Sequence, residues 1–305
     1  MRSLLSDSML STLDRYKPNA AEDLFSDDVQ QRLARWNRQR LAPRLPDRDR
    51  AKSIRDDAEM LQLQDRFIEA LRREVAGRVA DVPPDPRCFV SWFESLKDHG
   101  PGQNDPLFAW FEHEASLEEM RWYLRQEAAG EAGFDDLTAY TQVKMPERIK
   151  LELARNYWDE MGRGNAKAMH GPMLQRLVDA LELAPAIENT VGESLALANG
   201  MTAMATCRDL AWHALGALGA IELTAPGRSA AVAAGLKRLG VTARDRLYFD
   251  LHAVLDVKHS AAWNAEALAP AVAEDPNRAR AIAEGALMRL TCGARCFERY
   301  RRELW

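Results

Sequence analysis

Residues 247–263 read LYFDLHAVLDVKHSAAW and carry three polar side chains at helical spacing. His252, Asp256 and His259 are four and then three residues apart, so an α-helix would place them along one face. Apolar residues such as Leu251 form a stripe beside them, and few charges are present of the kind that solvate a surface helix. The segment therefore predicts a bundle helix whose polar face is either a row of metal ligands or a solvated surface.

The chain after residue 105 has the same helical character. Ala, Leu, Glu, Arg and Met dominate it, and no run of residues alternates cleanly with a period of two. Helix breakers separate the helical stretches at residues 100–106, 144–148, 162–165, 183–186, 224–228 and 274–277. They outline roughly six or seven helices of ordinary length. The predicted fold class is all-α, a helical bundle.

The N-terminal part of the chain is more polar than the rest. Residues 40–57 are predicted to form a charged connector, and residues 59–79 an amphipathic helix. We therefore expect two parts, an N-terminal helical extension over residues 1–85 and a bundle domain over residues 86–305.

Composition and charge narrow the class of protein. Hydrophobic residues make up 47% of the 305 residues and charged residues 29%, which is typical of a globular protein with a full core. The net charge of −5 gives no basic field for nucleic acid. The apolar stretches are too short for a membrane span, no secretion signal is recognisable, and the four cysteines lack a CxxC spacing. We expect a cytoplasmic protein with a small-molecule substrate, without nucleic-acid or membrane partners; a homodimer is compatible with the sequence.

Two pairs of residues combine a carboxylate with an imidazole. Asp256 and His259 form Asp-x-x-His, the aspartate version of the Glu-x-x-His pair of di-iron carboxylate bundles. Glu160 precedes the break at residues 162–165 and His170 follows it, so the kinked chain can direct both toward one point. Each pair also has a plain alternative as solvated polar residues.

Three further glutamates are candidate ligands. Glu222 ends a stretch of Ala, Leu, Ile and Gly, where a lone acid is either exposed at a helix end or buried as a ligand. Glu127 and Glu131 are four residues apart on one helix face, where like charges repel unless a cation lies between them. Imidazoles and carboxylates together suit iron or manganese better than a structural zinc site, and this number of ligands suits two metals.

In this order, the candidate residues resemble a known family. The segments NYWDEMGRGN…H, ending at His170, and His252-x-x-x-Asp256-x-x-His259 are similar to those of iron-containing redox enzymes with a heme-oxygenase-like fold, also called heme-oxygenase-like di-iron oxidases. The resemblance covers about residues 88–300 and implies a heme-oxygenase-like bundle. It also implies two Fe(II) per chain, O₂ as co-substrate, and N-oxygenation, oxidative C–C cleavage or desaturation of a small amine, amino-acid-like or fatty-acid-like substrate.

The resemblance further implies a role for each candidate residue. The catalytic residues would be Glu160, His170, Glu222, His252, Asp256 and His259. Of these, Glu160, His170 and His259 would hold one iron. The other iron would be held by His252, Asp256 and either Glu127 or Glu131, with Glu222 bridging or completing the set.

Two alternatives stay open at this point. A metal-free hydrolase resembling thiaminase II would use Cys207 as its nucleophile but would leave the three histidines without a role. A non-catalytic ligand-binding bundle would have lost its metal, although all three histidines remain. Arg228, Lys237 and Arg238 are candidates for binding a substrate carboxylate, although cations near helix ends are usually solvated.

Overall fold

A computed structural model describes residues 23–46, 49–130 and 133–305 of the chain. Every regular element in these ranges is helical, so the predicted all-α class is confirmed. The α-helices are α2 (Asp27–Leu41), α3 (Arg50–Val75), α4 (Pro86–His99), α5 (Pro106–His113), α6 (Leu117–Gly130), α7 (Phe134–Thr141), α8 (Glu147–Glu160), α9 (His170–Ala180), α10 (Gly192–Thr206), α11 (Ala211–Arg238), α12 (Leu247–Trp263), α13 (Ala269–Glu274) and α14 (Arg278–Leu304). Short 3₁₀ turns lie at Gly162–Gly164, Ala166–Ala168, Ile187–Asn189 and Arg208–Leu210, and a π-helical segment, Asn264–Leu268, joins α12 to α13.

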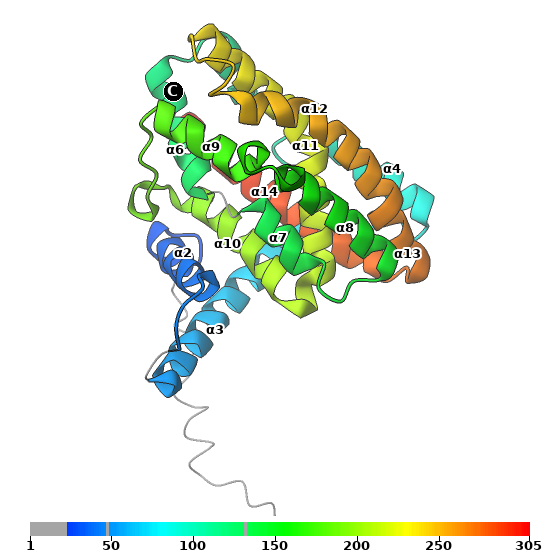
Figure 1. Ribbon diagram of the computed structural model, residues 1–305. Helices are drawn as coiled ribbons and strands as arrows, with labels where there is room; N and C mark the ends of the chain where they lie inside the picture. The colour runs from blue at the N-terminus through cyan, green and yellow to red at the C-terminus, as the bar shows by residue number, and fades with distance from the viewer. Residues whose placement is uncertain (1–22, 47–48, 131–132) are drawn as a thin grey trace, which may run out of the picture.

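The long helices α11 and α14 cross in the middle of the bundle and contact each other closely (Figure 1). Glycines permit this approach, because a Cβ at Gly216 would overlap the carbonyl of Ile282, and a Cβ at Gly285 would overlap the carbonyl of His213. The remaining helices pack around this pair. One apolar cluster includes Phe67, Phe93 and Trp263, and a second includes Phe111, Tyr123 and Phe297. Both α11 and α14 contribute to each cluster.

One of the predicted helix breaks is wrong. The sequence TAPGR does not end a helix, because α11 continues through Pro226 to Arg238. Packing against α12 and α14 overrides the local signal, and the side chains of Thr224 and Arg228 bond to nearby backbone carbonyls within the helix. The predicted connector is also shorter than expected, because α3 begins at Arg50, where the side chain of Asp49 accepts a hydrogen bond from the Lys52 amide. After residue 105 the described residues form ten α-helices rather than six or seven, since α5, α7 and α13 have only six to eight residues.

The N-terminal helices α2 and α3 pack directly on the bundle (Figure 1). The buried side chain of Asn199 in α10 bonds to Gln30 and Asn37 of α2. Arg72 of α3 donates to Glu284 of α14 at 3.0 Å. The division of the chain between residues 85 and 86 stays a prediction. No helix in the described ranges has the length and apolar character needed to cross a bilayer.

Candidate metal centre

Helix α8 presents a polar face to the interior of the bundle. Glu152, Asn156 and Glu160 are buried, and their spacing of four residues stacks them along one side of the helix. The chain then turns sharply at Gly162, which has a φ of 59° and no room for a Cβ beside Ala168. This turn brings the first residue of α9, His170, back to the end of α8.

Helices α11 and α12 supply the other polar side chains. Glu222 of α11 is only 2% exposed. On α12, Asp256 and His259 are buried and His252 is half-buried, so the three residues point into the bundle. The polar face that the sequence indicated on this helix is therefore not a solvated surface.

These six residues form two groups, each with three ligand atoms within 4.8 Å of one another. We call them the two-histidine group and the one-histidine group. The two-histidine group consists of Glu160, His170 and His252. The one-histidine group consists of Glu222, Asp256 and His259. The structure thus differs from the expected division, because His252 rather than His259 lies with Glu160 and His170, and Glu222 joins one group.

Contacts within each group are short. Nδ1 of His170 lies 2.7 Å from a carboxylate oxygen of Glu160, and the rings of His170 and His252 are 4.7 Å apart. Nδ1 of His259 lies 3.4 Å from a carboxylate oxygen of Glu222. The charge of Glu160 also acts on the ionisation of Glu222 and Asp256, so the two groups are neighbours.

Residues outside the groups fix the orientation of two imidazoles. Nδ1 of His252 donates to the backbone carbonyl of Tyr248 at 2.7 Å, which leaves Nε2 available. Nε2 of His259 contacts the carboxylate of Asp159 at 3.2 Å, which leaves Nδ1 facing Glu222. Such hydrogen bonds from the far side of a ring are typical of metal-binding histidines.

The donors fit a divalent cation. The Nδ1 atoms of His170 and His259 are buried and face carboxylate oxygens of Glu160 and Glu222, but among the described residues neither atom makes a hydrogen bond of good geometry. Buried polar atoms are rarely left without a partner, and a metal ion would supply one. All six donors are imidazole nitrogens or carboxylate oxygens, a set that suits iron, and no thiol belongs to either group.

The pKa values of the side chains in the one-histidine group also indicate that a positive charge would stabilise it. Burial, together with the charge of Glu222, raises the pKa of Asp256 to about 9. Burial also raises the pKa of Glu222, although contacts with His259 and Asn156 oppose this effect. Burial lowers the pKa of His259, but its contacts with Glu222 and Asp159 outweigh burial and raise the value to about 9. Without a cation, Asp256 and His259 would both hold a proton at neutral pH in the folded chain.

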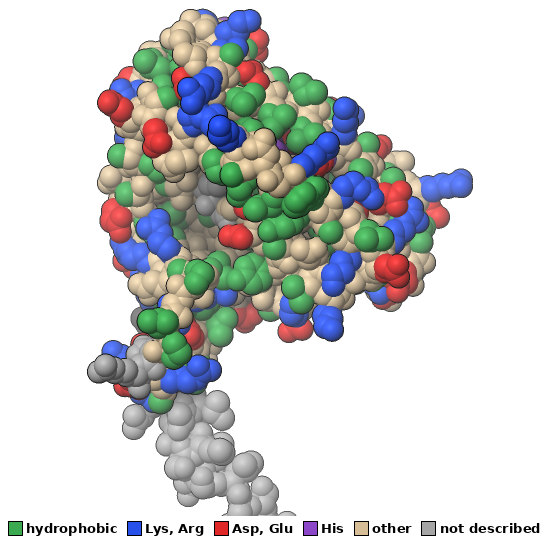
Figure 2. All heavy atoms as spheres, in the orientation of Figure 1, with side chains coloured by type: hydrophobic (Ala, Val, Ile, Leu, Met, Phe, Trp, Pro, Cys, Tyr) green, Lys and Arg blue, Asp and Glu red, His purple; other side chains and the backbone are tan. Residues whose placement is uncertain are grey.

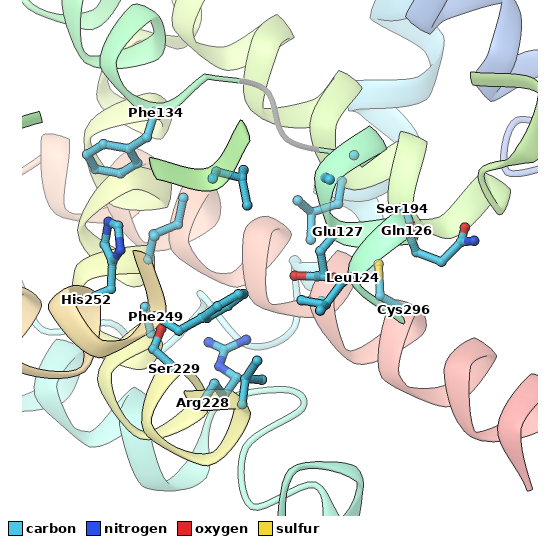
Figure 3. Close-up of a pocket in the computed structure, with 18 of the residues that line it drawn as sticks. Leu124, Gln126, Glu127, Phe134, Ser194, Arg228, Ser229, Phe249, His252 and Cys296 are labelled. Carbon is cyan, nitrogen blue, oxygen red and sulfur yellow. The ribbon is translucent and has the colours of Figure 1, made fainter. Parts of the chain in front are cut away.

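The groups open onto a cavity with a volume of about 180 Å³. Glu160, Glu222, His252 and Asp256 all line it, and most of the remaining wall is apolar. Figure 3 shows His252 and Phe249 of α12 on one side of this cavity and Glu127 of α6 on the other. The molecular surface is hollowed between α9 and α10 (Figure 2). A small molecule in the cavity would lie directly beside four of the six candidate ligands.

Of the two candidate ligands Glu127 and Glu131, the structure describes only Glu127. Glu127 lines the cavity but is not in either group, and it accepts a hydrogen bond from the hydroxyl of Tyr300 at 2.8 Å. Glu131 lies outside the described residues. A ligand from this part of the chain therefore stays a prediction.

The sequence interpretation missed Asn156 and Asp159. Asn156 donates to Glu222 at 2.5 Å, and Asp159 contacts His259. Burial raises the pKa of Asp159, but bonds from Arg163 and His259 outweigh burial and hold it below its usual range. The spacing of Glu152, Asn156 and Glu160 was a usable signal, because three polar residues repeat every four positions.

Cys207 lies elsewhere in the molecule. It follows α10 and lines a separate cavity together with Arg40, Gln64 and Thr206. It is not among the residues that line the cavity of the two groups. A hydrolase with Cys207 as nucleophile would therefore leave both groups unused.

Comparisons with known proteins agree with the all-α bundle. A crystal structure of a CADD-like protein of unknown function from Nostoc punctiforme is similar, with a TM-score of 0.51 at 16% identity over 79% of this chain and 98% of that one. A second crystal structure described in the same words has a TM-score of 0.49 at 17% identity, over 79% and 95% of the two chains. No curated protein matches the chain.

A family model identifies the protein family to which the chain belongs. The model for iron-containing redox enzymes matches residues 121–294, more than half of the chain. The matched region includes both groups and confirms the predicted heme-oxygenase-like fold. The chain belongs to the family of iron-containing redox enzymes.

Proposed function

We propose that the protein is a non-heme di-iron oxidase or oxygenase that uses O₂ to oxidise a small amine, amino-acid-like or fatty-acid-like substrate. The observation that carries the proposal is the pair of neighbouring groups beside one cavity, in which buried imidazole nitrogens face carboxylate oxygens without a hydrogen bond of good geometry among the described residues. One iron in each group would account for all six side chains. Bound iron would supply the redox chemistry with O₂.

The residues of the chain would position the metals and exclude water. Glu160, His170 and His252 would hold one iron, and Glu222, Asp256 and His259 the other. Apolar residues of the cavity wall would keep bulk water from the site; they include Leu197, Ile221, Val232 and Phe249. A small-molecule substrate would enter the cavity. We also propose a cytoplasmic location, because cysteines without a paired spacing are typical of reducing compartments.

Anaerobic titration with Fe(II), followed by elemental analysis, tests the metal content. We expect the wild-type protein to take up two Fe(II) per chain. Replacing one ligand of either group, as in His170→Ala or Asp256→Asn, should reduce the uptake to about one, because the other group keeps its three donors. His213→Gln is the matched control, since His213 is also buried beside a carboxylate, that of Glu284, but lies outside both groups.

Oxygen consumption tests the reaction. With iron bound, O₂ uptake should depend on an organic substrate from a panel of amines, amino acids and fatty acids, and it should be lost in both ligand variants. Iron uptake that is the same in wild type and variants would exclude the two groups as the iron site. Iron binding without O₂ uptake across the panel would favour a non-catalytic binding bundle.

A further inference from the structure

Away from the two groups, the cavity has a second charged region. Arg228 of α11 and Arg289 of α14 line it together with Glu127 of α6. In Figure 3 the guanidinium of Arg228 and the carboxyl of Glu127 both point into the cavity. Two cations and one anion in a largely apolar wall leave an excess of positive charge.

Arg228 is held in a fixed orientation. Its Nε donates to the backbone carbonyl of Thr224 at 2.9 Å, and one Nη donates to the hydroxyl of the same residue. Its guanidinium also lies over the ring of Phe297 at 5.4 Å. Burial and the charge of Arg289 lower the pKa of Arg228 to about 10, so it is still protonated at neutral pH.

Arg289 has two hydrogen-bond donor atoms that no described residue uses. Its Nε and Nη1 atoms are buried and have no partner among the described residues. Gly293, one turn later on α14, leaves the space that the guanidinium occupies, since a Cβ there would lie 3.0 Å from Nη1. Buried guanidinium groups normally bind carboxylates or other acceptors, so these donors are free for a ligand.

The described side chains of this region do not balance its charge, because Glu127 offsets at most one of the two arginines. Glu127 accepts a bond from Tyr300, which in turn lies 2.7 Å from the hydroxyl of Ser194, but no hydrogen bond joins Glu127 to either arginine in the described structure. Burial raises the pKa of Glu127, although the bond from Tyr300 and the charges of Arg289 and Arg228 oppose this effect. Burial also raises the pKa of the other titratable side chains nearby, so they are neutral; these are Tyr123, Cys296 and Tyr300.

An apolar stretch separates the arginines from the candidate ligands. Arg228 and Glu222 both line the cavity and are six residues apart on α11, which corresponds to about 9 Å along the helix axis. The wall of the cavity is otherwise mainly apolar, with Leu124, Leu177, Leu197, Ile221, Val232 and Phe249. Its volume, about 180 Å³, is of the order that accommodates a benzene-sized molecule or one somewhat larger.

We propose that the substrate is a small organic carboxylate with an apolar body and no ammonium group, bound through its carboxylate by Arg228 and Arg289. Its apolar body extends along the cavity toward the two groups, so oxidation occurs at a carbon several bonds from the carboxylate. One carboxylate balances the excess positive charge, whereas an amine adds to it. The inference rests on the proposed function and narrows its substrate class.

Calorimetry with matched ligands tests this assignment. The panel consists of aryl and alkyl carboxylates of increasing length, such as 3-phenylpropionate, each compared with the alcohol, the amine and the α-amino acid of the same skeleton. Binding is measured on the wild-type protein without metal and after anaerobic Fe(II) loading. We expect at least one carboxylate to bind at least tenfold more tightly than its alcohol and amine, with or without iron.

Substitution of each arginine tests whether it binds the carboxylate of the ligand. Arg289→Met should weaken carboxylate binding by about tenfold or more, because a charge-assisted bond is lost, while iron uptake stays unchanged. The variant should also fold, since Nε and Nη1 make no hydrogen bonds within the described protein. Arg228→Met should act in the same direction. Arg302→Met is the matched control, because its side chain lies on the same helix and is 60% exposed.

Three results would overturn the inference. These are equal binding of carboxylates and alcohols, tighter binding of amino acids or amines, and carboxylate binding that requires iron and survives both arginine substitutions. The last result would place the carboxylate on the metals. Failure of the wild-type protein to take up iron would count against the proposed function alone, because binding of carboxylates to the metal-free protein would still be measured.

Discussion

His259 contacts a different carboxylate through each of its ring nitrogens. Asp159 lies 3.2 Å from Nε2, and Glu222 lies 3.4 Å from Nδ1. Of the two adjacent acids at the end of α8, the sequence analysis selected only Glu160, but Asp159 also contacts the site. Helix periodicity separates adjacent residues by about 100°, and only the position of α12 brings Asp159 beside His259.

The sequence also could not predict which histidine belongs to which of the two groups. His252 and His259 are seven residues apart, so periodicity places both on one face of α12 without assigning either to a group. The tight turn at Gly162 determines the grouping, because it places the ring of His170 beside that of His252. Spacing predicted the candidate residues, and the path of the backbone between helices determined their partners.

The contact between Asp159 and His259 predicts a measurable effect on metal affinity. Asp159→Asn should raise the dissociation constant for Fe(II) by about 10- to 100-fold, because the imidazole loses the carboxylate that fixes its orientation. Stability should change little, since the other partner of Asp159, Arg163, is 71% exposed. Anaerobic calorimetry with Fe(II) measures the affinity. Asp179→Asn, on the exposed side of α9, should leave it unchanged; an equal loss there would exclude a specific role for Asp159.

At the scale of elements, α11 shows both the strength and the limit of sequence reasoning. Its composition correctly predicts helix, and its Pro226-Gly227 pair predicts a break that does not occur. Propensity is a local property, whereas the contacts of α11 with α5, α12 and α14 come from residues distant in sequence. For the same reason the sequence shows that α11 has several glycines but not that Gly216 is the one against α14.

Two glycines of α11 should therefore respond in opposite directions to alanine. Gly216→Ala should lower the free energy of unfolding by about 1–3 kcal/mol, because the added methyl group would overlap the carbonyl of Ile282 and force the helices apart. Gly227→Ala should raise it by about 0.5–1 kcal/mol, because nothing lies within 4 Å and alanine favours a helix. Urea unfolding measures both. Equal effects of the two substitutions would contradict the close packing of α11 on α14.

At the scale of the whole molecule, one buried carboxylate connects three helices. Glu284 of α14 accepts from Arg72 of α3 at 3.0 Å and lies 3.0 Å from Nε2 of His213 on α11. Bonds from His213, Arg72 and Arg280 lower the pKa of Glu284 to about 2, although partial burial opposes them. Composition could not predict this link, because Arg72 and Glu284 are 212 positions apart in the sequence.

The depressed pKa of Glu284 predicts how stability depends on pH. The folded state holds the carboxylate ionised, so its contribution is fully present above the usual pKa of about 4.5 and is lost as the pH falls toward 2. Glu284→Gln should cost on the order of 2–3 kcal/mol at neutral pH, and the difference from wild type should shrink below about pH 4.5. Urea unfolding across this range measures it. Glu274→Gln, whose side chain is 56% exposed, should match wild type at every pH. A deficit in Glu284→Gln that stays constant as the pH falls would mean that the glutamine disturbs packing and that the ionised carboxylate does not hold α3 to the bundle.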